Sequence, residues 1–179
     1  MYTANLMDNQ ICLLYHLTNM YPMKTLITTL MIVFSTSVNA QKYSKEESFN
    51  KEIITKAFQD WHNGTGNFFD LLTEDMHWEI TGSTPYSKTY TSKQEFLDKV
   101  IIPLNKKLKV KIKPTVRHIF ADHDMVITLW DGEATALDDK PYRSSYSWYM
   151  KMKNGKITEV VAFLDGIEFS DIMKRIQTN

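Results

Sequence analysis

The spacing of hydrophobic residues changes along the chain, from a helical period before residue 105 to a strand period after residue 108. The segments 44–63 and 92–104 each open on a capping box and then repeat apolar residues every three or four positions, which predicts two helices. Between them, residues 67–75 favour a short helix, and residues 76–81 alternate as a strand that carries Trp78. Trp61 ends the apolar stripe of the first helix, before Gly64 closes it.

Beyond residue 108 the alternation of apolar and polar residues persists through four candidate strands, at 108–120, 125–136, 143–152 and 157–165. A last helix is expected around residues 167–176. Helices followed by long antiparallel strands predict an α+β domain in which the helices cover one face of the sheet. We expect the sheet to curve strongly and to form a cone-shaped hollow around the N-terminal helices.

The turn Asn154-Gly155 sets the register of the last two strands. An Asn-Gly pair between alternating runs favours a two-residue type I′ turn. Continued along an unbroken ladder, this turn places Tyr146 opposite Phe163 and Ser144 opposite Asp165. The prediction is that Asp165 shares a face with these rings.

A second turn, at Asp138-Asp139, would set the strand before it in the same way. If it also holds two residues, Asp131 lies opposite Tyr146 and Leu129 opposite Trp148. In the first long strand His118 has the same parity as the apolar residues, although Pro114 could introduce a bulge and reverse it. Both aspartates and His118 are then expected on the concave side.

These positions describe a small-molecule site, which is typically apolar with a few convergent polar groups. The expected ligand-binding residues are Tyr146, Trp148, His118, Phe163, Trp61 and Trp78, and the expected catalytic residues are Asp165 and Asp131. A carboxylate buried among rings gains proton affinity and can act as an acid or a base near neutral pH. The structural alternatives remain open: Asp165 could cap the last helix, Asp131 could mark a bulge beside Gly132, and His118 could be a core histidine.

The N-terminal forty residues are interpreted as lying outside the folded domain. Residues 23–40 have the charge, apolar stretch and small-residue cleavage site of a secretory signal peptide, which predicts a periplasmic or secreted protein. Residues 1–22 come either from a start codon assigned too early or from a genuine long leader. Residues 41–179 then form a single domain. The chain's one cysteine, Cys12, precedes that domain, so neither a disulfide nor a lipid anchor is expected there.

The charge balance argues against nucleic acid as a partner, because the net charge is +0 and a phosphate backbone is normally met by a basic surplus. The lysines of 106–113 alternate with apolar residues and are interpreted as the solvated face of an edge strand. Residues 122–124, Asp-His-Asp, are read as a hairpin turn. The spacing of histidines and carboxylates predicts no zinc site, and the absence of a glycine-rich phosphate loop predicts no cofactor.

Two segments resemble a known family. Residues 75–100, "DMHWEITGSTPYSKTYTSKQEFLDKV", and residues 150–165, "MKMKNGKITEVVAFLD", are similar to the central passage and the closing hairpin of SnoaL-like proteins of the nuclear transport factor 2-like superfamily. The resemblance implies a cone-shaped α+β barrel with a deep pocket, often dimeric through the outer face of its sheet. It also implies an acid at the place of Asp165 and, as in epoxide hydrolases, near Asp131. Those hydrolases carry an arginine where this chain has Leu129, so epoxide hydrolysis is not expected.

Two hypotheses of function follow. The first is an exported protein that binds a small apolar molecule in an aromatic pocket. The second is a cofactor-free isomerase, cyclase or lyase that uses Asp165 as its acid or base. Either one is expected to form a homodimer through the sheet.

Overall fold

The structure, a computed structural model, describes residues 43–177. The predicted extension 1–22 and signal peptide 23–40 lie outside the described residues, so export stays a prediction from the sequence. Within residues 43–177 no helix combines the length and apolar character needed to cross a membrane.

The first helix of the described chain, α3 (Lys45–Asn63), begins and ends where its caps predict. The Ser44 side chain accepts a hydrogen bond from the Glu47 backbone N–H, and the Glu47 carboxylate accepts one from the Ser44 backbone N–H. Gly64, at a φ of 69°, closes the helix in the left-handed conformation. The buried face of α3 carries Ile54 and Phe58, which pack against the sheet.

The segment after α3 differs from its prediction. A 3₁₀ turn (Phe68–Leu71) is followed directly by strand β1 (Leu72–Ile80), so only the first half of the predicted helix 67–75 is helical. The expected loop 82–90 ends in a short strand, β2 (Thr89–Tyr90), that pairs with β1. The burial of Leu72 and Met76 on one side of the strand explains why tertiary packing overrides the local helical preference.

The predicted helix 92–104 forms as three consecutive pieces. They are α4 (Lys93–Phe96), a π-helical turn (Leu97–Ile101) and α5 (Ile102–Lys106). Pro103 supplies no backbone N–H, so the carbonyl of Lys99 has no partner four residues ahead. Single π turns inside α-helices are common at functional sites, and this one lies in the cavity wall described below.

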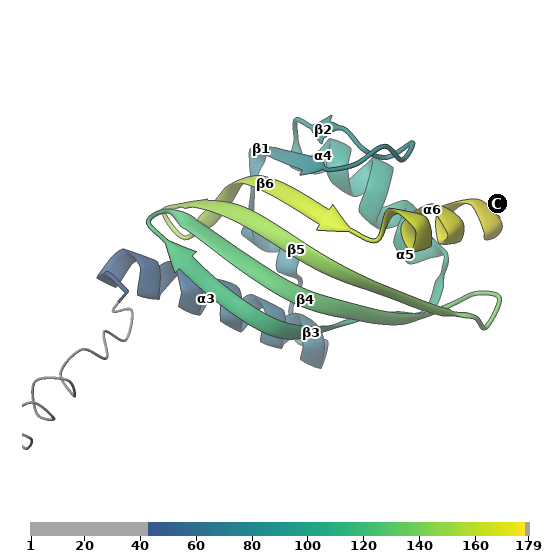
Figure 1. Cartoon of the computed structure of the whole chain (residues 1–179), viewed down its shortest axis with the longest axis horizontal. Helices are drawn as coiled ribbons and strands as arrows, with labels where there is room; N and C mark the ends of the chain where they lie inside the picture. Colours follow the sequence, from purple (N-terminus) through teal and green to yellow (C-terminus); the bar gives the residue numbers. More distant parts are fainter. Residues whose placement is uncertain (1–42, 178–179) are drawn as a thin grey trace, which may run out of the picture. The chain divides into compact units, whose positions relative to one another are not determined.

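The four long strands are β3 (Leu108–Asp122), β4 (Met125–Ala136), β5 (Pro141–Lys153) and β6 (Lys156–Leu164), followed by α6 (Gly166–Arg175). The six-stranded sheet has the order β2-β1-β6-β5-β4-β3. All neighbours are antiparallel except β1 and β6, which run parallel. Figure 1 shows the long strands curving together, with α3 packed along β3. The predicted α+β class with a curled sheet is confirmed.

The Asn154-Gly155 turn has the predicted geometry. The pairing of β5 with β6 beyond this turn differs from the prediction. Both residues have positive φ values of 52° and 74°, and Met152 pairs with Ile157 as expected. One pair further on, Thr158 is left unpaired, because Lys151 faces Glu159. This β-bulge moves every later residue of β6 to the opposite face of the sheet.

Two further irregularities, one in the β4–β5 turn and one in β3, place Asp131 and His118 on the outer face of the sheet. Residues 137–140 connect β4 and β5, and the Ala136 backbone N–H donates to the Lys140 carbonyl at 2.9 Å. This turn is one residue longer than the predicted one, so Asp131 pairs with Ser145 and not with Tyr146. In β3 the register shifts between Val116 and His118, which reverses the parity of His118. The prediction that His118 lies on the concave side is therefore wrong, and the bulge responsible lies near Arg117, three residues beyond the alternative position at Pro114.

The core lies between the inner face of the sheet and the helices. Its largest fully buried side chains are Trp78, Trp130, Tyr90, Tyr142, Phe58, Phe68, Phe96, Ile54, Met76, Met150, Ile157 and Ile172. All of β3 to β6 contribute to this face through alternate residues. The large aromatic side chains on this face come mainly from β4 and β5, with Trp78 added from β1.

The bulge in β6 generates a stability prediction. Ile157 is 0% exposed at the last regular pair before the bulge, whereas Ile167 is 83% exposed on α6. Ile157→Ala should lower the free energy of unfolding by about 2–5 kcal/mol, because it leaves a cavity in a packed core. Ile167→Ala, the matched control, should change it by less than about 0.5 kcal/mol. Urea denaturation followed by circular dichroism measures both, and equal values would contradict the assigned facing of β6.

Candidate functional site

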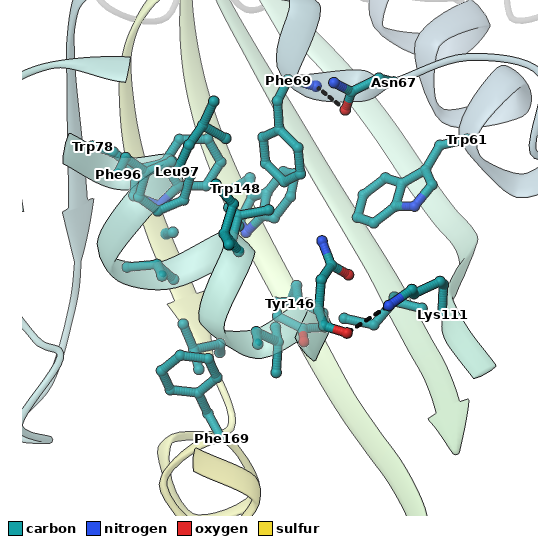
Figure 2. Close-up of a pocket in the computed structure, with 18 of the residues that line it drawn as sticks. Trp61, Asn67, Phe69, Trp78, Phe96, Leu97, Lys111, Tyr146, Trp148 and Phe169 are labelled. Atoms are coloured by element: carbon teal, nitrogen blue, oxygen red, sulfur yellow. Dashed lines mark hydrogen bonds between the residues drawn. The ribbon is translucent and has the colours of Figure 1, made fainter. Parts of the chain in front are cut away.

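A cavity of about 600 Å³ lies between the inner face of the sheet and the helical segment 93–106. This volume is within the range of small-molecule sites. Its floor consists of side chains from β1, β4, β5 and β6, and its walls come from the end of α3, the loop after it, the π turn and α5. Figure 2 shows aromatic side chains from opposite sides of the cavity pointing inward.

The aromatic rings of the floor pack against one another rather than lying singly. Trp130 stacks on Tyr146 with ring centroids 4.0 Å apart and an interplanar angle of 8°. Trp148 meets Trp130 edge to face at 4.8 Å and Trp78 at 5.0 Å. Rings held by several partners lose little freedom on ligand binding, so the floor offers a preorganised apolar surface.

Tyr146 brings a phenol to the floor of the cavity, and Tyr142, which lies behind the lining, is its hydrogen-bond partner. The hydroxyls of Tyr142 and Tyr146 hydrogen-bond each other at 2.8 Å, and both side chains are buried. Burial raises the pKa of Tyr146 above its ordinary value and the pKa of Tyr142 well above it. Both phenols therefore stay protonated at neutral pH, and one of the two hydroxyls donates its hydrogen to the other.

Four of the residues predicted for ligand binding line this cavity: Trp61, Trp78, Tyr146 and Trp148. Phe163 does not, because the bulge at Thr158 turns it to the outer face, where it is 49% exposed. There it contacts Tyr149, with ring centroids 5.8 Å apart. Leu164 and Ala162 take its expected place on the inner side.

The prediction that Asp165 faces the hollow is wrong. Its side chain is exposed and accepts hydrogen bonds from the backbone N–H groups of Ile167 and Glu168, at 3.0 and 3.1 Å. Asp165 is therefore the N-cap of α6, the structural alternative that the sequence left open. Its backbone N–H donates to Ser144 Oγ at 3.2 Å, which fixes the start of the helix against β5.

Asp131 and His118 also lie outside the cavity. Asp131 accepts a hydrogen bond from Ser145 Oγ at 2.6 Å and pairs with Arg117 at 3.1 Å on the outer face of the sheet. His118 is exposed and stacks on Phe120, with ring centroids 5.8 Å apart. Among the described residues, neither a carboxylate nor an imidazole lines the cavity.

Sequence reasoning missed the wall that the helical segment 93–106 provides. Leu97, Val100, Ile101 and Leu104 line the cavity, together with Asn105. Their apolar period predicted a helix but not which face of it meets the hollow. Lys111 was also missed, because the alternation of lysines predicted only a solvated strand.

One cluster has the composition of a metal site. Ligand atoms of Glu47, Asp122 and His123 lie within 4.8 Å of one another near the turn between β3 and β4. Their contacts already join them: the His123 backbone N–H donates to Glu47 at 2.9 Å, and its ring lies 2.7 Å from Asp122. These groups tie the start of α3 to the hairpin, and residues 123–124 form the predicted turn.

No family model and no curated protein matches this chain. Solved structures do match this chain, with low sequence identity. An NTF2-like protein from Burkholderia thailandensis has a TM-score of 0.57 at 16% identity, covering 70% of this chain and 97% of that one. The domain therefore has the nuclear transport factor 2-like fold.

Two other structures with the nuclear transport factor 2-like fold carry functional names. A SnoaL-like protein from Jannaschia sp. CCS1, named as a candidate polyketide cyclase, has a TM-score of 0.61 at 11% identity and covers 77% of this chain and 100% of that one. A candidate isomerase from Bacillus subtilis has a TM-score of 0.57 at 17% identity, with 72% and 95% covered. At these identities the likeness concerns the fold.

The N-cap position of Asp165 leads to a prediction. Asp165→Ala should lower the free energy of unfolding by about 0.5–2 kcal/mol, whereas Asp165→Asn, which keeps a capping oxygen, should change it by only a few tenths. Urea denaturation of the three proteins measures this difference. A neutral Asp165→Ala variant would contradict the capping role.

Proposed function

We propose that this domain binds a small apolar molecule in its aromatic cavity. The observation that carries the proposal is the cavity itself, about 600 Å³ in volume, with Trp61, Trp78 and Trp148 in its lining. A cavity of this size would be filled by packed side chains if the domain served only as a scaffold, because protein interiors normally leave few voids larger than a water molecule. The solved structures that share the fold include a candidate cyclase and a candidate isomerase, which supports a small-molecule role.

The enzymatic alternative lacks its expected acid and base. Asp165 caps a helix and Asp131 is paired on the outer face of the sheet, so neither carboxylate reaches a molecule in the cavity. General acid–base catalysis requires a group within hydrogen-bond reach of the proton it transfers. Binding is therefore the function that the geometry favours over turnover by Asp165.

Filling part of the cavity should weaken binding. Leu97 is half-buried in the cavity wall, whereas Val110 is exposed on β3 and lies outside the lining. Leu97→Trp should weaken the binding of the neutral probe N-phenyl-1-naphthylamine by about tenfold or more, because the larger ring occupies part of the site. Val110→Trp adds the same indole elsewhere and should leave the affinity unchanged.

Fluorescence titration measures both affinities, and circular dichroism confirms that both variants fold. The proposal fails if the unmodified protein shows no saturable one-to-one binding. It also fails if Leu97→Trp binds the probe as tightly as Val110→Trp.

We also propose that a second copy of the chain covers the outer face of the sheet. Two adjacent rows of paired residues cross β3 to β6 on that face: Phe120, Ile127, Tyr149 and Val161 in one, and His118, Leu129, Ser147 and Phe163 in the other. Of these, Phe120 is 51% exposed and Phe163 is 49% exposed. A contiguous apolar patch of this kind marks an interaction surface, and a two-fold axis would bring it against itself.

A charge placed in this outer patch should separate the copies. Phe163→Lys should weaken self-association by about tenfold or more, because it buries an unpaired ammonium in the interface. Leu137→Lys, at an exposed apolar residue of the β4–β5 loop, is the control. Sedimentation equilibrium measures both. A monomeric unmodified protein, or a dimer that tolerates Phe163→Lys, would contradict the proposal.

A further inference from the structure

The mouth of the cavity differs from its floor in charge. Lys111 is an exposed residue on β3 and lines the cavity, and it is the one charged side chain in the lining among residues 43–177. Figure 2 shows it on the same side of the cavity as Trp61. Any bound molecule that extends from the aromatic floor to the mouth therefore ends beside an ammonium group.

Backbone carbonyls hold this ammonium in place without neutralising it. Lys111 Nζ donates hydrogen bonds to the carbonyl oxygens of Asn105 and Leu108. It makes no ion pair with a carboxylate in the described part of the chain, in contrast to Lys109, which pairs with Asp139. The carbonyls restrict the side chain, so less freedom is lost when an anion binds.

A second donor lies next to Lys111. The side-chain amide of Asn105 lines the cavity and has no hydrogen-bond partner within residues 43–177. Lysines 106 and 113, both exposed, and the absence of a lining carboxylate make the surroundings of the mouth positive. An apolar wall, a fixed ammonium and a free amide donor together form a site for an amphipathic anion.

We propose that the cavity takes an apolar molecule with one anionic group, a carboxylate or a chemically similar acid, whose charge lies at Lys111 and whose body lies on the rings. The inference rests on the proposed binding function and further specifies that the ligand carries a negative charge. It also assigns a ligand-binding role to one lysine of the segment 106–113, in which Lys109 pairs with Asp139 and the buried Lys107 donates to the Ile176 carbonyl.

A pair of fluorescent probes separates charge from apolar fit. 1-Anilinonaphthalene-8-sulfonate carries a sulfonate, and N-phenyl-1-naphthylamine has the same rings without it. Lys111→Met should weaken binding of the sulfonate about five- to tenfold and change binding of the neutral probe less than twofold, because only the charged group loses its partner. Lys113→Met, on the same strand but outside the lining, should change neither by more than twofold.

Salt provides an independent measurement on the full chain. Raising the ionic strength from about 0.05 to 0.5 M should weaken sulfonate binding to the unmodified protein more than to Lys111→Met, because salt screens an exposed charge. If the neutral probe binds but Lys111→Met weakens both probes equally or neither, the assignment of Lys111 is wrong and the binding function stands. If neither probe binds the unmodified protein, the proposed function itself fails.

Discussion

The domain depends on the burial of one aromatic surface. This surface is the inner face of β4 and β5, which α3 and the helical segment 93–106 cover. Trp130, Tyr146 and Trp148 contact one another, and the two tryptophans also contact Phe58 and Trp61 of α3. Because these rings are large and rigid, they support the helices at a distance that smaller side chains would let collapse. The same contacts that stabilise the sheet therefore also shape the floor of the cavity.

The class of the fold could be predicted because its signals are local. The capping boxes at Ser44 and Ser92 place two helix starts, and the Asn154-Gly155 turn places the last hairpin. The short strand β2 and the parallel pairing of β1 with β6 could not be predicted, since they depend on residues far apart in the sequence. Local chemistry specifies elements, and tertiary packing specifies their neighbours.

The candidate site was harder to predict, because it depends on parity along the strands. Residues 160–164 of β6 are apolar at every position, so their alternation does not reveal the inner face. The spacing of three between Ile157 and Val160, both buried, is the only trace of the bulge at Thr158. In β3, Val116 and Ile119 show the same spacing across the bulge near Arg117. Trp61 lies on helix α3, and the bulges in β3 and β6 do not change the facing of Trp78, Tyr146 and Trp148, so all four line the cavity.

The π turn at Leu97–Ile101 has a consequence for variation in this fold. A π turn holds one residue more than the α turn it replaces. Inserting or deleting a single amino acid between 97 and 101 would therefore reshape one wall of the cavity while every strand pairing stays intact. The shape of the cavity can therefore change through chain length as well as through substitution, at a position outside the paired strands.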